Sequence, residues 1–235
     1  MGLPQVATPT VDLTAPVGPQ VYTLIHQRII SNALHPGARI SETEVARDYG
    51  ISRQPVREAF IKLAEEGLVE VRPQRGTYVR KISVQAVMDA RFVREAIEAE
   101  VVRLLAATPQ PDLMRDLLRQ IAVQQAVLET DVRGFVPLDD QFHRTLAEAA
   151  GKRFAWSVVD GMKSQMDRVR QLSTVRLRKE TVIEHHTAIA HAIGVGDANA
   201  ADAAMRQHLR EILTDLPLIR QSLPEYFDET GDKAP

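Results

Sequence analysis

The sequence contains no cysteine among its 235 residues, which excludes disulfide bonds and thiolate metal sites. Any metal ion must therefore be bound by histidine and carboxylate side chains. Aromatic residues are scarce at 5%, whereas hydrophobic residues make up 44% and charged residues 26%, which is ordinary for a globular protein. No apolar run approaches the roughly 20 residues that a membrane helix needs, so we expect no membrane partner.

Neither positive nor negative charge is in large excess, since the formal net charge is only −2. The charge is nevertheless uneven: residues 53–81 carry seven basic side chains against four acidic ones. This local excess can supply contacts to the phosphates of a nucleic acid. The N-terminus lacks the basic and apolar segments of a secretory signal, so we expect a cytoplasmic location.

The first part of the chain is predicted to be an arm followed by a helix. Residues 1–19 are rich in proline, threonine, valine and glycine without a helical period, so we expect a disordered or loosely attached N-terminal arm. From Val21 the apolar spacing predicts a helix, which Pro36 and Gly37 end.

Two capped helices and a hairpin are expected next. Ser41 opens a Ser-Glu-Thr-Glu capping box, and the helix that it starts ends at Gly50. Ser52 is expected to cap the following helix. Two short strands, over 68–72 and 77–80, then form a hairpin. Helix, helix, tight turn, helix and hairpin together predict a winged helix-turn-helix over 20–82.

The remainder of the chain shows no strand pattern after Ser83. Amphipathic helices are expected approximately over 84–107, 112–129, 137–150, 152–173, 178–193 and 197–221. The predicted fold is therefore mainly α: a winged helix-turn-helix with a small β-hairpin, then an all-α antiparallel helical bundle over 83–225. Residues 226–235 are expected to be a flexible tail.

The helix that follows Ser52 is the candidate DNA-reading element. In a helix-turn-helix, the N-terminal residues of the second helix meet base edges in the major groove. Here those residues are Arg53, Gln54 and Arg57, and the two arginines share one helix face. Arginine can bond guanine and glutamine can bond adenine, while the Ser52 hydroxyl can bond a phosphate.

The tip of the hairpin offers a second basic group. Arg75, followed by Gly76, is placed to enter the minor groove. The alternative for the basic residues of this region is a solvated face, in which the arginines pair with Glu58, Glu65 and Glu66. From the charges alone, both interpretations remain open.

A resemblance to a known family favours DNA binding. The stretch 41–60, SETEVARDYGISRQPVREAF, followed by LAEEGLV over 63–69 and by Arg75-Gly76, resembles the DNA-binding signature of the GntR family. The resemblance implies that base- and phosphate-contacting positions fall on Arg53, Gln54, Pro55 and Arg57. Some members have an arginine at the position of Thr43, so no contact is carried over to that residue.

A second set of residues has metal-ligand chemistry. Asp139 and His143 are spaced i, i+4, so they project from one helix face, while His186 and His208 lie in two later helices. One Asp and three His from three helices can converge in a bundle and suit Zn, Ni or Mn(II). The spacing alone also fits a surface Asp/His pair and structural histidines.

The same residues lie in motifs that resemble the effector domain of the FadR subfamily (the FCD type). These motifs are LDDQFH over 138–143, HTAI over 186–189, HL over 208–209 and REAIE over 94–98. Many members hold a divalent metal through the Asp and three His, which implies a metal at Asp139, His143, His186 and His208, with zinc expected first. Two departures are Pro137, just before the Asp, and Lys152, where asparagine is common.

The effector expected from this reading is a small carboxylate, such as a hydroxy, sugar or dicarboxylic acid. Open metal positions would bind its carboxylate, and Arg94 would anchor it through a bidentate pair. The alternative for Arg94 is an intrahelical pair with Glu98 at i, i+4. Arg168 and Arg170 are weaker candidates.

We therefore expect a sequence-specific transcriptional regulator, a repressor, whose affinity for its operator is controlled by a carboxylate at the metal. The operator is expected to be double-stranded DNA with a short inverted repeat, bound by a homodimer, because symmetric half-sites need a two-fold partner. One alternative is a sensor in which the metal itself is the signal. A metal-dependent enzyme is a further alternative, but no general base or nucleophile motif appears, so no catalytic residue is expected.

Overall fold

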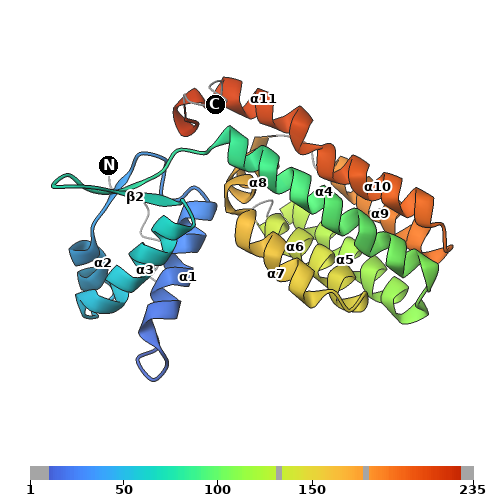
Figure 1. The fold of residues 1–235 in the computed structure, drawn as a ribbon, viewed down its shortest axis with the longest axis horizontal. Helices are drawn as coiled ribbons and strands as arrows, with labels where there is room; N and C mark the ends of the chain where they lie inside the picture. Colours follow the sequence, from blue (N-terminus) through green and yellow to red (C-terminus); the bar gives the residue numbers. More distant parts are fainter. Residues whose placement is uncertain (1–10, 131–133, 177–179, 229–235) are drawn as a thin grey trace. The chain divides into compact units, whose positions relative to one another are not determined.

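A computed structural model describes residues 11–130, 134–176 and 180–228 of the chain (Figure 1). The described residues divide into two compact units: those of 11–82 together with 225–228 form the first, and those of 83–224 form the second. Within the described residues, none of the helices combines the length and apolar character that crossing a bilayer requires.

The first unit contains three helices and a small antiparallel sheet. Its elements are α1 (Val17–Ile30), β1 (Arg39–Ile40), α2 (Glu42–Asp48), α3 (Arg53–Glu65), β2 (Val69–Arg72) and β3 (Gly76–Val79). The strand order is β1-β3-β2, so the predicted hairpin is present and a third strand joins it. Sequence analysis missed β1 because two residues are too few to show an alternating pattern. The unit has the architecture of a winged helix-turn-helix.

The start of this unit is more ordered than expected. The backbone N–H of Asp12 donates to Oε1 of Gln20 over 2.9 Å, and Nε2 of Gln20 donates back to the Asp12 carbonyl over 2.8 Å. Helix α1 begins at Val17 rather than Val21. The disordered arm expected over 1–19 is therefore wrong for residues 11–19, since the Gln20 amide pairs with the preceding backbone. Residues 1–10 lie outside the described residues.

The chain returns to the first unit after its last helix. Phe227 forms a bridge with Ile82, which is fully buried, and Phe227 itself is only 2% exposed. The backbone N–H of Ile82 donates to the Tyr226 carbonyl over 2.8 Å, and the Tyr226 hydroxyl lies 2.6 Å from Nδ1 of His35. The flexible tail expected from 226 onward is therefore wrong for 226–228, because an aromatic anchor holds the segment. Residues 229–235 lie outside the described residues.

This anchor leads to a first prediction. Phe227→Ala should destabilise the first unit by about 3–5 kcal/mol, because it leaves a cavity where a buried ring was. Chemical denaturation followed by circular dichroism measures the loss. Phe154→Ala is the matched control, since that ring is 82% exposed on the second unit. Equal stability of the two variants would contradict a structural role for the returning segment.

The second unit is entirely helical within the described residues. Its helices are α4 (Val84–Ala107), α5 (Pro111–Thr130), α6 (Phe135–Ala149), α7 (Arg153–Met162), α8 (Ser164–Arg176), α9 (Glu180–Gly194), α10 (Ala198–Arg210) and α11 (Ile212–Ser222). A 3-10 turn, Pro224–Tyr226, follows. Figure 1 shows α4 running alongside α10, with α9 next to α10 and α5 beside α6. The bundle agrees with the predicted fold class.

Two of the expected helices are each broken once. The helix expected over 152–173 divides at Lys163, whose buried ammonium donates to Asp140 over 2.7 Å and to Asp167 over 2.5 Å. The helix expected over 197–221 divides at Glu211, whose N–H donates to the carbonyl of His208, three residues back. An apolar period continues across both breaks, so hydrophobicity alone gives no sign of them.

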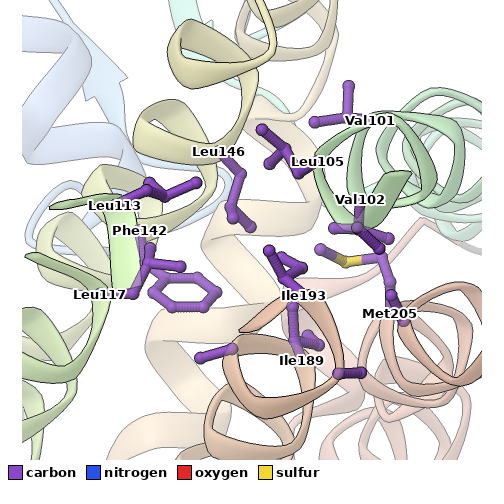
Figure 2. Packing of buried hydrophobic residues seen from close by; sticks show 14 of the residues in the cluster. Val101, Val102, Leu105, Leu113, Leu117, Phe142, Leu146, Ile189, Ile193 and Met205 are labelled. Atoms are coloured by element: carbon purple, nitrogen blue, oxygen red, sulfur yellow. The ribbon is translucent and has the colours of Figure 1, made fainter. Parts of the chain in front are cut away.

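The core of the second unit lies between five of its helices. Figure 2 shows side chains from α4, α5, α6, α9 and α10 pointing toward one another. Leu117, Phe142, Ile189 and Ile193 are fully buried there, so the apolar stripes predicted from sequence meet in one core. Because α6, α9 and α10 all contribute to this core, buried polar side chains next to these core residues, or one turn before them, are brought together as well.

Candidate nucleic-acid interface and candidate metal centre

Helix α3 presents its first turn to solvent. Ser52 occupies the N-cap with extended backbone, but its hydroxyl makes no capping hydrogen bond, which corrects the expectation that its side chain caps this helix. Pro55 fits in the first turn, where backbone N–H groups have no helical partner to lose. On α2, by contrast, Ser41 does accept from the Glu44 N–H as predicted.

The polar side chains expected to read DNA are all exposed. Arg53 pairs with Glu42 over 3.3 Å, and the Gln54 amide donates to Glu58 over 3.0 Å. Arg57 is exposed and has no ion pair among the described residues. Surface pairs of this kind contribute only about 0–1 kcal/mol, so the phosphate charge of DNA can displace them. The alternative pairing of the arginines with Glu58, Glu65 and Glu66 is not formed by Arg53, whose partner is Glu42.

The hairpin tip depends on a glycine. Gly76 has φ +104°, and a Cβ there would lie 2.9 Å from Nε of Arg39, so a side chain would be strained and crowded. Arg75 is exposed at the tip, and its carbonyl accepts from the Tyr78 hydroxyl over 3.1 Å. Arg39, on β1, adds an exposed basic group beside the tip that sequence analysis missed, because β1 was missed.

The four predicted metal ligands meet inside the second unit. Asp139 and His143 come from α6, His186 from α9 and His208 from α10; all are buried, and one ligand atom of each lies within 4.8 Å of the others. Nε2 of His143 lies 3.0 Å from Nε2 of His208 and 3.6 Å from Oδ2 of Asp139. Nε2 of His186 lies 3.4 Å from Oδ1 of Asp139.

The protonation of the cluster favours a cation. Burial lowers the pKa of His186 to about 3 and, together with the neighbouring histidines, lowers the pKa of His208 well below its usual value. Burial alone would raise the pKa of Asp139, but Arg170 and the nearby histidines outweigh it and lower that pKa. His186 and His208 are therefore neutral and Asp139 is ionised, which are the forms in which these groups bind metal.

These residues also fit a metal by their spacing. Metal–ligand bonds of about 2.0–2.2 Å require ligand atoms about 3.0–3.5 Å apart. Three pairs are close to this, at 3.0, 3.4 and 3.6 Å, and all four ligand atoms lie within 4.8 Å of one another. Nε2 of His186 is buried and has no hydrogen-bond partner among the described residues, although it faces a carboxylate oxygen. A buried lone pair facing an anion is unfavourable unless a cation lies between them.

A layer of partners surrounds the ligands. Glu98 lies 2.5 Å from Nδ1 of His143, although the ring N–H is not well aligned with that oxygen, and Gln124 lies 2.7 Å from Nδ1 of His186. Burial would raise the pKa of Glu98, but Arg94 and His143 lower it to about 2. The ring of Phe142 stacks on His186 with centroids 4.1 Å apart. The His143 and His186 rings therefore each have a partner on the side away from the cluster, whereas Nδ1 of His208 has no hydrogen-bond partner among the described residues.

The predicted effector anchor has a different immediate partner. Nε of Arg94 donates to Glu98 over 2.6 Å, so the intrahelical pair weighed as the alternative is formed. Arg94 still lines a cavity of about 60 Å³ beside the cluster, together with Asp139, Arg170 and His208, and one of its terminal nitrogens has no partner among the described residues. Arg170 forms ion pairs with Asp139 and Asp140.

Comparison with known families decides what kind of protein this is. Residues 18–79 match the gntR family of bacterial regulatory proteins, and residues 89–211 match the FCD domain. The HTH-type transcriptional repressor RspR of Escherichia coli is 38% identical over 218 residues, covering 92% of this chain and 96% of its own. This chain belongs to the GntR family. As a member with an FCD domain, it is a DNA-binding transcriptional regulator.

Other GntR relatives and solved structures agree. A probable D-xylose utilization operon repressor of Paenarthrobacter nicotinovorans is 29% identical, covering 84% of this chain and 87% of its own. The structure of E. coli McbR/YncC has a TM-score of 0.73 at 17% identity, covering 87% and 97%. A GntR regulator from Rhodococcus has a TM-score of 0.72 at 24% identity, covering 85% and 97%. At these identities, the two structures support the fold alone.

Some residues around the GntR regulator's candidate metal centre were not found from sequence. Gln124 was missed entirely, and Arg170 was ranked low. Gln124 could have been noticed, because it continues the apolar stripe of Leu113, Leu117 and Ile121 on α5, where a polar residue is unexpected. A polar side chain on an apolar stripe indicates a buried hydrogen-bonding role.

Proposed function

We propose that this GntR regulator is a repressor whose affinity for its operator is controlled by a small carboxylate bound at a divalent metal ion. Asp139, His143, His186 and His208 hold the ion, and zinc is the metal that their chemistry suits best. When bound, the ion offers open coordination positions to a carboxylate oxygen. The convergence of these four buried groups within 4.8 Å is the observation that carries the proposal.

The charges lining the cavity support an anionic effector. Arg94 and Arg170 contribute two positive charges, while Asp139, Glu211 and Asp215 contribute three negative ones. The lining therefore has a charge of about −1 without metal and about +1 with a divalent ion. We infer that a carboxylate binds only when the metal is present, with the free N–H of Arg94 and the guanidinium of Arg170 as its protein partners.

The first unit supplies the DNA contacts in this proposal. Arg53, Gln54 and Arg57 read bases in the major groove, Ser52 and Pro55 lie at the phosphate backbone, and Arg75 with Gly76 enters the minor groove. The exposure of Ser52, Arg53, Gln54, Arg57 and Arg75 on α3 and the hairpin supports this assignment, and Pro55 and Gly76 are half-buried beside them. A homodimer on a short inverted repeat is expected from the symmetry of such sites. Two similar proteins named as repressors support repression.

Thermal unfolding separates the proposed effector from a pure metal signal. Metal-stripped protein is mixed with Zn²⁺ alone, with hydroxy, sugar and dicarboxylic acids alone, and with both. The effector, at about 100 times its Kd, should stabilise the zinc-loaded protein by about 2.7 kcal/mol, or about 5–10 °C in Tm. The same acid should give no shift without zinc.

Operator binding then decides between the two candidates. Operator sequences are first selected from random DNA with the wild-type protein, and Kd is measured with each combination of Zn²⁺ and acid. A change in Kd that needs both components supports the proposal. A full change with Zn²⁺ alone, and none added by any acid, would make the protein a metal sensor instead.

A further inference from the structure

Gln124 lies in the middle of α5 and is completely buried. Its side-chain amide makes two contacts on opposite sides. Nε2 donates to the backbone carbonyl of Leu138 over 3.0 Å, and Oε1 lies 2.7 Å from Nδ1 of His186. The amide thus connects the backbone beside Asp139 with a candidate metal ligand on another helix.

Donor and acceptor chemistry fixes the orientation of these groups. The Leu138 carbonyl can only accept, so the amide nitrogen of Gln124 must face it. The amide oxygen therefore faces His186, and because that oxygen can only accept, Nδ1 of His186 must carry the proton. A neutral imidazole has a single N–H, so Nε2 of His186 is left as a bare lone pair.

The bare nitrogen points into the cluster. Nε2 of His186 lies 3.4 Å from Oδ1 of Asp139 and has no hydrogen-bond partner among the described residues. In the other tautomer, an Nε2–H would donate to this carboxylate and occupy both groups. The position of one proton on His186 therefore decides whether two of the four groups are available to a cation.

We propose that Gln124 is a positioning residue that holds His186 in its Nδ1–H tautomer and so keeps Nε2 available to the metal. This inference rests on the metal centre proposed above and adds to it a residue that touches no metal. Outer partners of this kind typically change metal affinity about 10- to 100-fold when they are removed. Phe142 stacks on the same ring and fixes its plane, but it does not determine which ring nitrogen of His186 carries the proton.

The chain offers a matched control on the same helix. Gln120 lies one turn before Gln124, and its amide donates to Asp116 over 2.9 Å and to Thr145 over 3.0 Å. It is of the same residue type and also bonds across to α6, but these two hydrogen bonds involve none of the four candidate ligands. Gln120→Leu therefore removes a comparable interhelical hydrogen bond without touching His186.

The experiment compares Gln124→Leu, Gln124→Glu and Gln120→Leu with the wild type. Nitrogen-15 NMR of the histidine rings in metal-stripped protein reports which nitrogen of His186 carries the proton. Zinc affinity is measured by competition with a chelator, and Tm verifies that each variant is folded. Glutamate retains an oxygen that accepts from Nδ1, whereas leucine of similar size offers none.

We expect the tautomer of His186 and the zinc affinity to depend on a hydrogen-bond acceptor at position 124. Gln124→Leu should move the His186 proton to Nε2 and weaken zinc binding about 10- to 100-fold, while Gln124→Glu keeps the Nδ1–H tautomer and stays within about threefold of wild type. Gln120→Leu should change neither. An unchanged tautomer in Gln124→Leu, or an equal loss of zinc in Gln124→Glu, would overturn the proposal. If the wild type binds no zinc, the metal centre itself fails, and the NMR of metal-free protein still decides the tautomer.

Discussion

Arg57→Ala should weaken binding to the selected operator by about 1–3 kcal/mol, or roughly 5- to 150-fold, while binding to random DNA falls only a few-fold. The physical reason is that a bidentate bond to a base edge exists only on the correct sequence, whereas a phosphate contact exists on every sequence. Arg57 is the preferred position, because it is exposed on α3 and has no ion pair among the described residues to release before it meets DNA.

Fluorescence anisotropy on operator and random duplexes at one fixed salt concentration measures both affinities. Arg115→Ala is the control for loss of charge, since Arg115 is exposed on α5 of the second unit and pairs with Asp112. Equal losses on the two duplexes would assign Arg57 to phosphate contact alone. A variant that binds the operator as tightly as the control would remove Arg57 from the interface.

The second large effect concerns the metal. The double variant His143→Ala, His208→Ala should lose bound metal completely, because it removes two of four ligands whose Nε2 atoms lie 3.0 Å apart. Two remaining groups on α6 and α9 leave too few donors for a structural or regulatory zinc site. Elemental analysis after dialysis against Zn²⁺ should give about one equivalent for the wild type and none for the variant.

His191→Ala provides the matched control, because His191 is an exposed histidine on α9, the helix that carries His186. Its metal content should equal that of the wild type. Full metal retention in the double variant would contradict the ligand assignment. An equal loss of metal in His191→Ala would show that zinc binds the surface instead.

The sequence predicted the helices of the DNA-binding unit but missed two of its long-range pairings. The capping box at Ser41 and the apolar face of α3 are local signals, so they predicted the helices correctly. Strand β1 and the bridge to Phe227 are formed by pairings with residues far along the chain. Such pairings leave no periodic trace in the short segments that make them, so sequence analysis missed both.

In the candidate metal centre, too, local spacing was predictable, whereas contacts between distant segments were not. Asp139 and His143 have a recognisable local spacing, His186 and His208 were candidates as histidines of two later helices, and the family resemblance favoured a metal at all four. The sequence could mark Gln124 as a buried polar residue but could not predict its partner, because the hydrogen bond between Gln124 and His186 depends on the rotation of α5 against α9. The ion pair of Arg94 with Glu98 was predictable as an alternative, since both lie on one helix, four residues apart.

The returning segment at Phe227 has a consequence for how the protein is made. Residues 225–228 leave the ribosome after every residue of α4–α11, yet they complete the unit that begins with α1. At about 5–20 residues per second, translation of the intervening helices takes on the order of 10 s. During that time the backbone of Ile82 lacks its pairing with the 226–228 segment. A newly synthesised regulator therefore completes its DNA-binding unit only after the helical unit that is proposed to control it has been made.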